Sequence, residues 1–93
     1  MKYNIKRTPD KPYTYKGHIR IFSNNLTVND FKWHRDKGTR FIYVISGSNW
    51  YLQFDNCLPI LLVYNKYYKI PSAKYHRLIN KSSVNLKLKI LEY

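Results

Sequence analysis

Short runs of β-forming residues, separated by turn residues, constrain the fold of this chain more than any other feature. The clearest runs cover residues 39–45, 50–54 and 84–92, which are rich in β-branched, aromatic or alternating apolar residues. Similar runs occur at residues 18–22, 31–34, 59–64, 66–70 and 75–79, and most are followed by Gly, Pro, Asn or Ser. None shows helical periodicity. The pattern predicts an all-β sandwich or closed barrel.

The length of 93 residues suits one domain. We expect residues 1–93 to form a single unit, with an extended arm or edge strand over 1–17 and the barrel over 18–93. The last run alternates almost perfectly, which places Leu86, Leu88 and Ile90 on one face of a strand. The intervening lysines would then face solvent.

The charge allows two interpretations. Lys and Arg number 17 against 5 Asp and Glu, giving a net charge of +12. Such an excess is typical of nucleic-acid partners, but the charges are spread along the chain, and a compositional bias would produce them as well. Residues 64–69 interleave Tyr and Lys, as single-strand binders do. A tyrosine-rich outer strand or a subunit interface is the commoner explanation.

No segment suggests export or membrane insertion. The N-terminus lacks the apolar core of a signal peptide. The longest apolar run, residues 58–64, is far shorter than the ~20 residues that span a bilayer. The single cysteine, Cys57, cannot form an intrachain disulfide. We expect a cytoplasmic protein with no membrane partner.

A candidate metal site involves two of the three histidines. His34 and Asp36 are one residue apart, so in a strand both side chains project to the same face. A third ligand must come from another strand, and His76 is the natural candidate. Two His and one carboxylate with open positions suit Fe(II), and zinc, manganese or nickel also accept such ligands.

The spacing around these residues resembles the two motifs of the cupin superfamily. The first motif, His-x-His, Glu and Gly, is similar to HRDKGTRFIYVISG over residues 34–47. His34 and Gly47 match, whereas Asp36 stands at the second His and Arg40 at the Glu. The second motif, Gly, Pro-x-Gly, His and Asn, is similar to residues 65–80. Its matching residues are Pro71, His76 and Asn80, with Asn65 and Ala73 in place of the two glycines.

The resemblance, which also extends to small stand-alone cupins of tailed phages, implies a double-stranded β-helix (jelly-roll) barrel with a metal in its mouth. Two interpretations of Arg40 stay open. It binds an anionic group of a ligand, since its planar fork pairs with carboxylates, or it pairs with Asp36 and leaves no metal site. Oxygenase, isomerase and metabolite-binding functions are all compatible with the fold.

The sequence therefore predicts a mononuclear metal site of His34, Asp36 and His76 that binds or transforms a small, anionic ligand. The alternative is a non-enzymatic, basic binding or assembly module on a degenerate cupin barrel, with nucleic acid or protein as its partner. Whether the protein is an enzyme stays open, and a homodimer is compatible with either hypothesis.

Overall fold

The computed structural model describes residues 13–92, which form an all-β unit. Its strands and single 3-10 helix (η1) are β1 Thr14–Lys16, β2 Ile19–Phe22, η1 Val28–Asp30, β3 Arg40–Ser46, β4 Trp50–Phe54, β5 Ile60–Leu61, β6 Tyr67–Ile70, β7 His76–Asn80 and β8 Leu86–Glu92. The prediction of an all-β fold is confirmed. Residues 1–12 of the expected N-terminal arm lie outside the described range.

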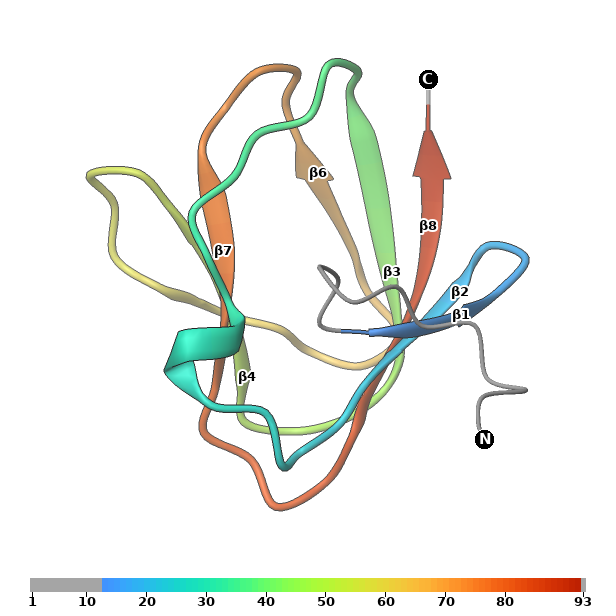
Figure 1. Cartoon of the computed structure of the whole chain (residues 1–93). Coiled ribbons are helices and arrows are strands. Elements are labelled where there is room, and N and C mark those ends of the chain that lie inside the picture. The colour runs from blue at the N-terminus through green and yellow to red at the C-terminus, as the bar shows by residue number, and fades with distance from the viewer. Residues whose placement is uncertain (1–12, 93) are drawn as a thin grey trace.

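Two antiparallel sheets make up the fold. One has five strands in the order β1-β2-β8-β3-β6, and the other has three in the order β5-β4-β7. In Figure 1, β4 and β7 lie on one side of the molecule and β3, β6 and β8 on the other. The chain crosses between the sheets after β3, β5, β6 and β7. Strands from β5 onward therefore alternate between the two sheets, which enclose one core.

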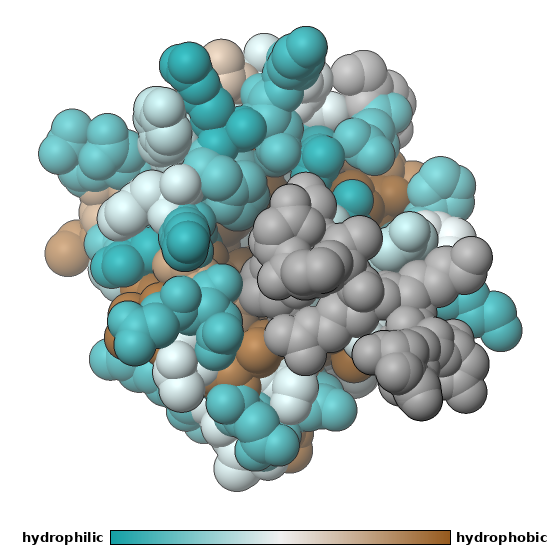
Figure 2. Space-filling model, viewed as in Figure 1, coloured by the Kyte–Doolittle hydropathy of each residue, from teal (hydrophilic) through white to brown (hydrophobic). Residues whose placement is uncertain are grey.

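Alternation along the strands fills that core. Trp50 and Leu52 of β4 are almost completely buried, as are Val44 of β3 and Leu86 and Leu88 of β8. The predicted inward face of β8 is thus confirmed. Figure 2 shows mostly hydrophilic side chains on the described surface in view, with hydrophobic ones set deeper between them.

Of the predicted strands, one is absent from the structure and another is much shorter than expected. Residues 31–34 are not a strand: they follow η1, and only His34 forms an isolated β-bridge, with His76. The expected strand over 59–64 is reduced to Ile60–Leu61 at a sheet edge. Pro59 has no N–H to give to a ladder, and the side chains at 60, 61, 63 and 64 are exposed. Neither segment gains the burial that a longer strand needs.

The glycine-like positions of the two motifs have the backbone that a glycine would favour. Asn65 has φ 69° and Ala73 has φ 61°, both in the left-handed region, where Asn is tolerated and Ala is strained. Gly47 has φ 131°, and a Cβ there would lie 3.0 Å from Leu86 Cδ1 and 3.1 Å from the Asn85 carbonyl oxygen. Asn65 and Ala73 therefore keep the positive-φ turns that glycines would form at these positions of the motif.

Within residues 13–92, no helix is long and apolar enough to cross a membrane.

Candidate metal centre

His76 is the buried part of the candidate site. It begins β7, and only 4% of its surface is exposed. Its Nδ1 lies 2.8 Å from the carbonyl oxygen of Lys74, a contact that requires the proton on Nδ1. Burial is the main cause that lowers the pKa of His76 below its usual value of 6.5. A neutral ring with its Nε2 lone pair free is the form that binds a metal.

His34 lies beside His76 on the segment that joins η1 to β3. The two residues exchange backbone hydrogen bonds of 3.1 and 2.8 Å, and their rings are 4.3 Å apart. In Figure 1 this segment runs along β7 before it turns into β3. The His34 ring is held in the same way as the His76 ring, since its Nδ1 lies 3.1 Å from the Lys32 carbonyl oxygen. Its side chain, however, is exposed.

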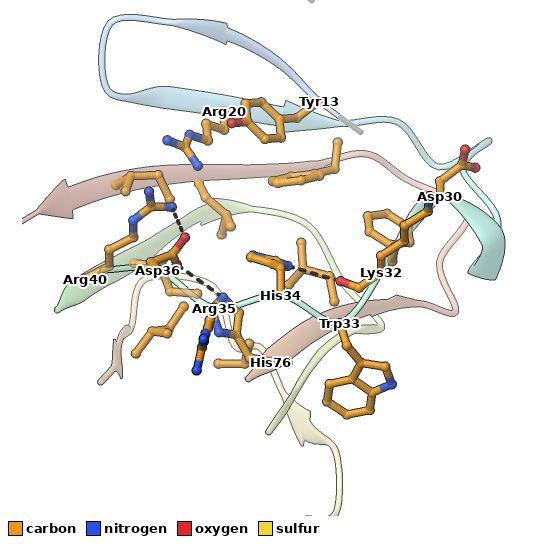
Figure 3. A pocket seen from close by; sticks show the side chains of 18 of the residues that line it. Tyr13, Arg20, Asp30, Lys32, Trp33, His34, Arg35, Asp36, Arg40 and His76 are labelled. Atoms are coloured by element: carbon orange, nitrogen blue, oxygen red, sulfur yellow. Dashed lines mark hydrogen bonds and ion pairs between the residues drawn. The ribbon is translucent and has the colours of Figure 1, made fainter. Parts of the chain in front are cut away.

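Asp36 completes the cluster from the same segment. Its Oδ1 lies 3.5 Å from Nη1 of Arg40, and its Oδ2 lies 3.5 Å from Nε2 of His76. That Oδ2 atom is buried and has no hydrogen-bond partner. Backbone bonds hold the segment in place, because Ala73 N–H donates to the Asp36 carbonyl (2.7 Å) and the Ser72 hydroxyl to the Lys37 carbonyl (2.7 Å). Figure 3 shows the three ligand candidates side by side.

The donor set fits a divalent metal. One ligand atom from each of His34, Asp36 and His76 can be chosen so that all lie within 4.8 Å of one another. Ligands about 2.1 Å from one ion at tetrahedral or octahedral angles are roughly 3.0–3.5 Å apart. The Asp36–His76 pair already meets this separation, so any closing movement falls to the exposed His34. The clustering predicted from sequence is therefore observed, although the predicted strand that motivated it is absent.

Arg40 begins β3 and is held between two carboxylates. Besides Asp36, its Nη2 lies 3.2 Å from Oε2 of Glu92, its partner in the β3–β8 register. Of the two interpretations open from sequence, the structure contains the contact with Asp36. This contact uses Oδ1 alone and leaves Oδ2 turned toward His76. The ion pair and a metal site are therefore compatible.

A cavity of about 700 Å³ adjoins the cluster. Its deep wall is apolar, with Ile42, Leu52 and Leu88. Arg20 of β2 lines it from across the cluster, with its guanidinium 4.6 Å from the Tyr13 ring centroid (Figure 3). No carboxylate pairs with Arg20 among residues 13–92. Sequence reasoning missed this residue, because Ile19 and Ile21 alternate with Arg20. Phe22, an apolar residue two positions after Arg20, was the only contrary signal in this run.

Comparison with known proteins supports the fold. No family model and no curated protein matches the sequence. Among solved structures, a DMSP lyase from Ruegeria pomeroyi superposes with a TM-score of 0.67 and 12% identity, over 80% of this chain and 35% of the lyase. This chain thus spans about a third of that enzyme.

Two cupins of more similar length also superpose. An RmlC-like cupin with a double-stranded β-helix fold from Methanocaldococcus jannaschii gives a TM-score of 0.64 and 12% identity, covering 99% of this chain and 90% of the other. A cupin-domain protein from Bordetella pertussis gives 0.61 and 17% identity, covering 81% and 77%. The predicted double-stranded β-helix is confirmed as a fold, whereas the likeness to phage cupins stays a prediction.

Proposed function

Because this chain has the cupin fold, we propose that it holds one divalent metal ion on His34, Asp36 and His76 and binds a small anionic ligand beside it. One observation carries the proposal. Nε2 of His76 and the buried Oδ2 of Asp36 face each other at 3.5 Å, and Oδ2 has no donor. With the imidazole proton engaged on Nδ1, both atoms are acceptors. A cation between them removes the cost of this arrangement.

Each residue has a defined part in such a site. The Lys74 and Lys32 carbonyls fix the orientation of the two imidazoles, as outer hydrogen bonds do in metal centres. Arg40 holds one oxygen of Asp36 and leaves the other for the ion, so it is a positioning residue. When bound, iron, zinc, manganese or nickel would supply a Lewis acid that polarises a coordinated oxygen.

The cavity favours an anionic ligand. Four cationic residues and two carboxylates line it, namely Arg20, Lys32, Arg35, Arg40, Asp30 and Asp36. Because Arg40 is already held by Asp36 and Glu92, Arg20 is the cation best placed to pair with a ligand carboxylate or phosphate. A volume of about 700 Å³ lies within the usual range for small-molecule sites.

The test of the metal is metal content after tag-free purification, with His76→Ala and His34→Ala alongside. The matched control is His18→Ala, which removes the third histidine, an exposed residue outside the cluster. We expect near-stoichiometric metal in the parent and the control, and loss in both site variants. Equal metal content in all four proteins would sink the proposal, and so would a parent that neither carries metal nor gains thermal stability from added divalent ions.

The test of the ligand is the thermal shift of metal-loaded protein with oxalate, succinate and phosphate. Arg20→Gln should remove any shift, while Lys37→Gln, an exposed residue away from the cavity, should keep it. A shift that survives in Arg20→Gln would assign the anion to another cation.

A further inference from the structure

The side of the five-stranded sheet that faces away from the core carries two tyrosines and several lysines. The inward residues of β3 and β8 are buried, so Phe41 and Tyr43 of β3 and Lys87, Lys89 and Leu91 of β8 project outward. On β6 the outward residues are Tyr67 and Lys69, both exposed. We call this surface, with Lys16 of β1 and Ile19 and Ile21 of β2, the outer face.

Strand register places these residues in a continuous row. Tyr67 of β6 pairs with Tyr43 of β3, which pairs with Lys89 of β8. Lys89 pairs in turn with Ile19 of β2, and Ile19 with Lys16 of β1. At about 4.8 Å per strand, the row extends roughly 19 Å across the sheet. Two aromatic rings thus lie at one end, and lysines follow within the same row.

The two tyrosine rings lie against each other, with their planes inclined at 46°. The Tyr43 and Tyr67 ring centroids are 4.7 Å apart, and Tyr67 is 61% exposed. The Tyr43 hydroxyl donates to Oδ1 of Asn65, which fixes the direction of its ring. Tyr68, between two outward residues, turns inward and packs against the core. Of the Tyr- and Lys-rich segment noted in the sequence, only alternate residues therefore belong to this surface.

Charge on the outer face has one sign. The carboxylates among residues 13–92 are Asp30 in η1, Asp36 and Glu92 around Arg40, and Asp55 after β4. None lies on the outer face, and within the same residues no carboxylate pairs with Lys69, Lys87 or Lys89. Strand β2 also reverses the usual alternation, since its isoleucines face outward while Arg20 lines the cavity.

We propose that the outer face binds single-stranded nucleic acid, with bases stacking on Tyr43 and Tyr67 and phosphates pairing with Lys16, Lys69, Lys87 and Lys89. Aromatic rings and lysines on the same face of a sheet suit bases and phosphates respectively. A second copy of this chain fits less well, because a two-fold contact would set the same lysines against one another. The site is on the opposite side of the sheet from the metal cluster and does not depend on it.

The test is fluorescence anisotropy of labelled 20-nucleotide single strands, DNA and RNA, titrated with protein at 50 and 200 mM salt. Four phosphate contacts predict a slope of log affinity against log salt of about −3. The double variant Lys87→Gln with Lys89→Gln should weaken binding roughly tenfold at low salt and make the slope shallower by about 1.4. Its matched control, Lys74→Gln with Lys81→Gln, removes the same charge from exposed positions elsewhere and should leave affinity unchanged.

Stacking is tested separately. Tyr67→Ser should weaken binding at least about fivefold without changing the salt slope, whereas Tyr75→Ser, at an exposed tyrosine outside the outer face, should not. Equal losses in both lysine double variants would overturn the proposal in favour of general charge attraction. Absence of binding to either single strand would also overturn it. So would an affinity for heparin equal to that for the single strands, together with no effect of Tyr67→Ser. Self-association that the Lys87 and Lys89 changes strengthen would favour a second copy of this chain instead.

Discussion

The two histidines of the candidate site make the same local contacts but stand on different kinds of support. His76 begins a strand that β4 pairs along its whole length, and it is buried. His34 sits on a segment without regular pairing, joined to β7 through one bridge, and it is exposed. One ligand is thus positioned by the barrel itself. His34 lies on a segment that a bound metal would help to hold against β7.

The largest expected effect separates these two ligands. Both His76→Ala and His34→Ala should abolish metal retention. In the metal-free protein, with EDTA present, His76→Ala should lower the free energy of unfolding by about 1–3 kcal/mol, because it leaves a cavity at a buried position. His34→Ala should change it by less than about 0.5 kcal/mol, as exposed substitutions do. Urea unfolding with EDTA measures both values, and equal losses would show that the two supports are equivalent.

Asp36→Asn tests whether the two facing acceptors destabilise the metal-free protein. The amide can donate to Nε2 of His76, so a hydrogen bond replaces the repulsion between acceptors. We expect metal retention to fall by at least about tenfold, while metal-free stability rises by roughly 0.5–1.5 kcal/mol. The comparison is made in EDTA by urea unfolding. A loss of metal-free stability would mean that the ion pair with Arg40 outweighs the repulsion.

The depressed pKa of His76 gives the metal-free protein a pH dependence. Burial lowers the folded pKa below the unfolded value of 6.5, so the unfolded state binds the proton first as pH falls. Stability should therefore be full above 6.5 and decline below it, by at most about 1.4 kcal/mol per pH unit for one proton. Unfolding in EDTA between pH 8 and 5 checks this, and His76→Gln should flatten the decline.

The smallest effect concerns the turn that holds the exposed ligand segment. Ala73 has positive φ, and its N–H donates to the Asp36 carbonyl. Ala73→Gly should relieve the strain and raise stability by about 0.5–1 kcal/mol. Asn65→Gly should gain less, because Asn tolerates this backbone region. Thermal unfolding of both variants gives the ranking, which a destabilised Ala73→Gly protein would contradict.

Much of the site was predictable because its residues are few and their spacing is distinctive. His34, Asp36 and His76 were identified from a chain with only three histidines, and the structure brings them together. Arg20 could not be found in this way. On the short strand β2, Ile19 and Ile21 alternate with Arg20, so alternation by itself places the isoleucines inside. The structure has the opposite orientation, because Phe22, on the same face as Arg20, is packed in the core.

The sequence by itself determined the all-β class, the inward face of β8 and the turns at Asn65 and Ala73, because these depend on alternation and on local backbone preference. Tertiary structure decided which oxygen of Asp36 faces His76, how Arg40 is shared between Asp36 and Glu92, and that the outer face carries lysines without carboxylates. These features arise from contacts between segments that are far apart in the chain, such as β3 with β8 and the Asp36 segment with Ala73 and His76. Register between distant segments is fixed by the whole core and not by any one segment.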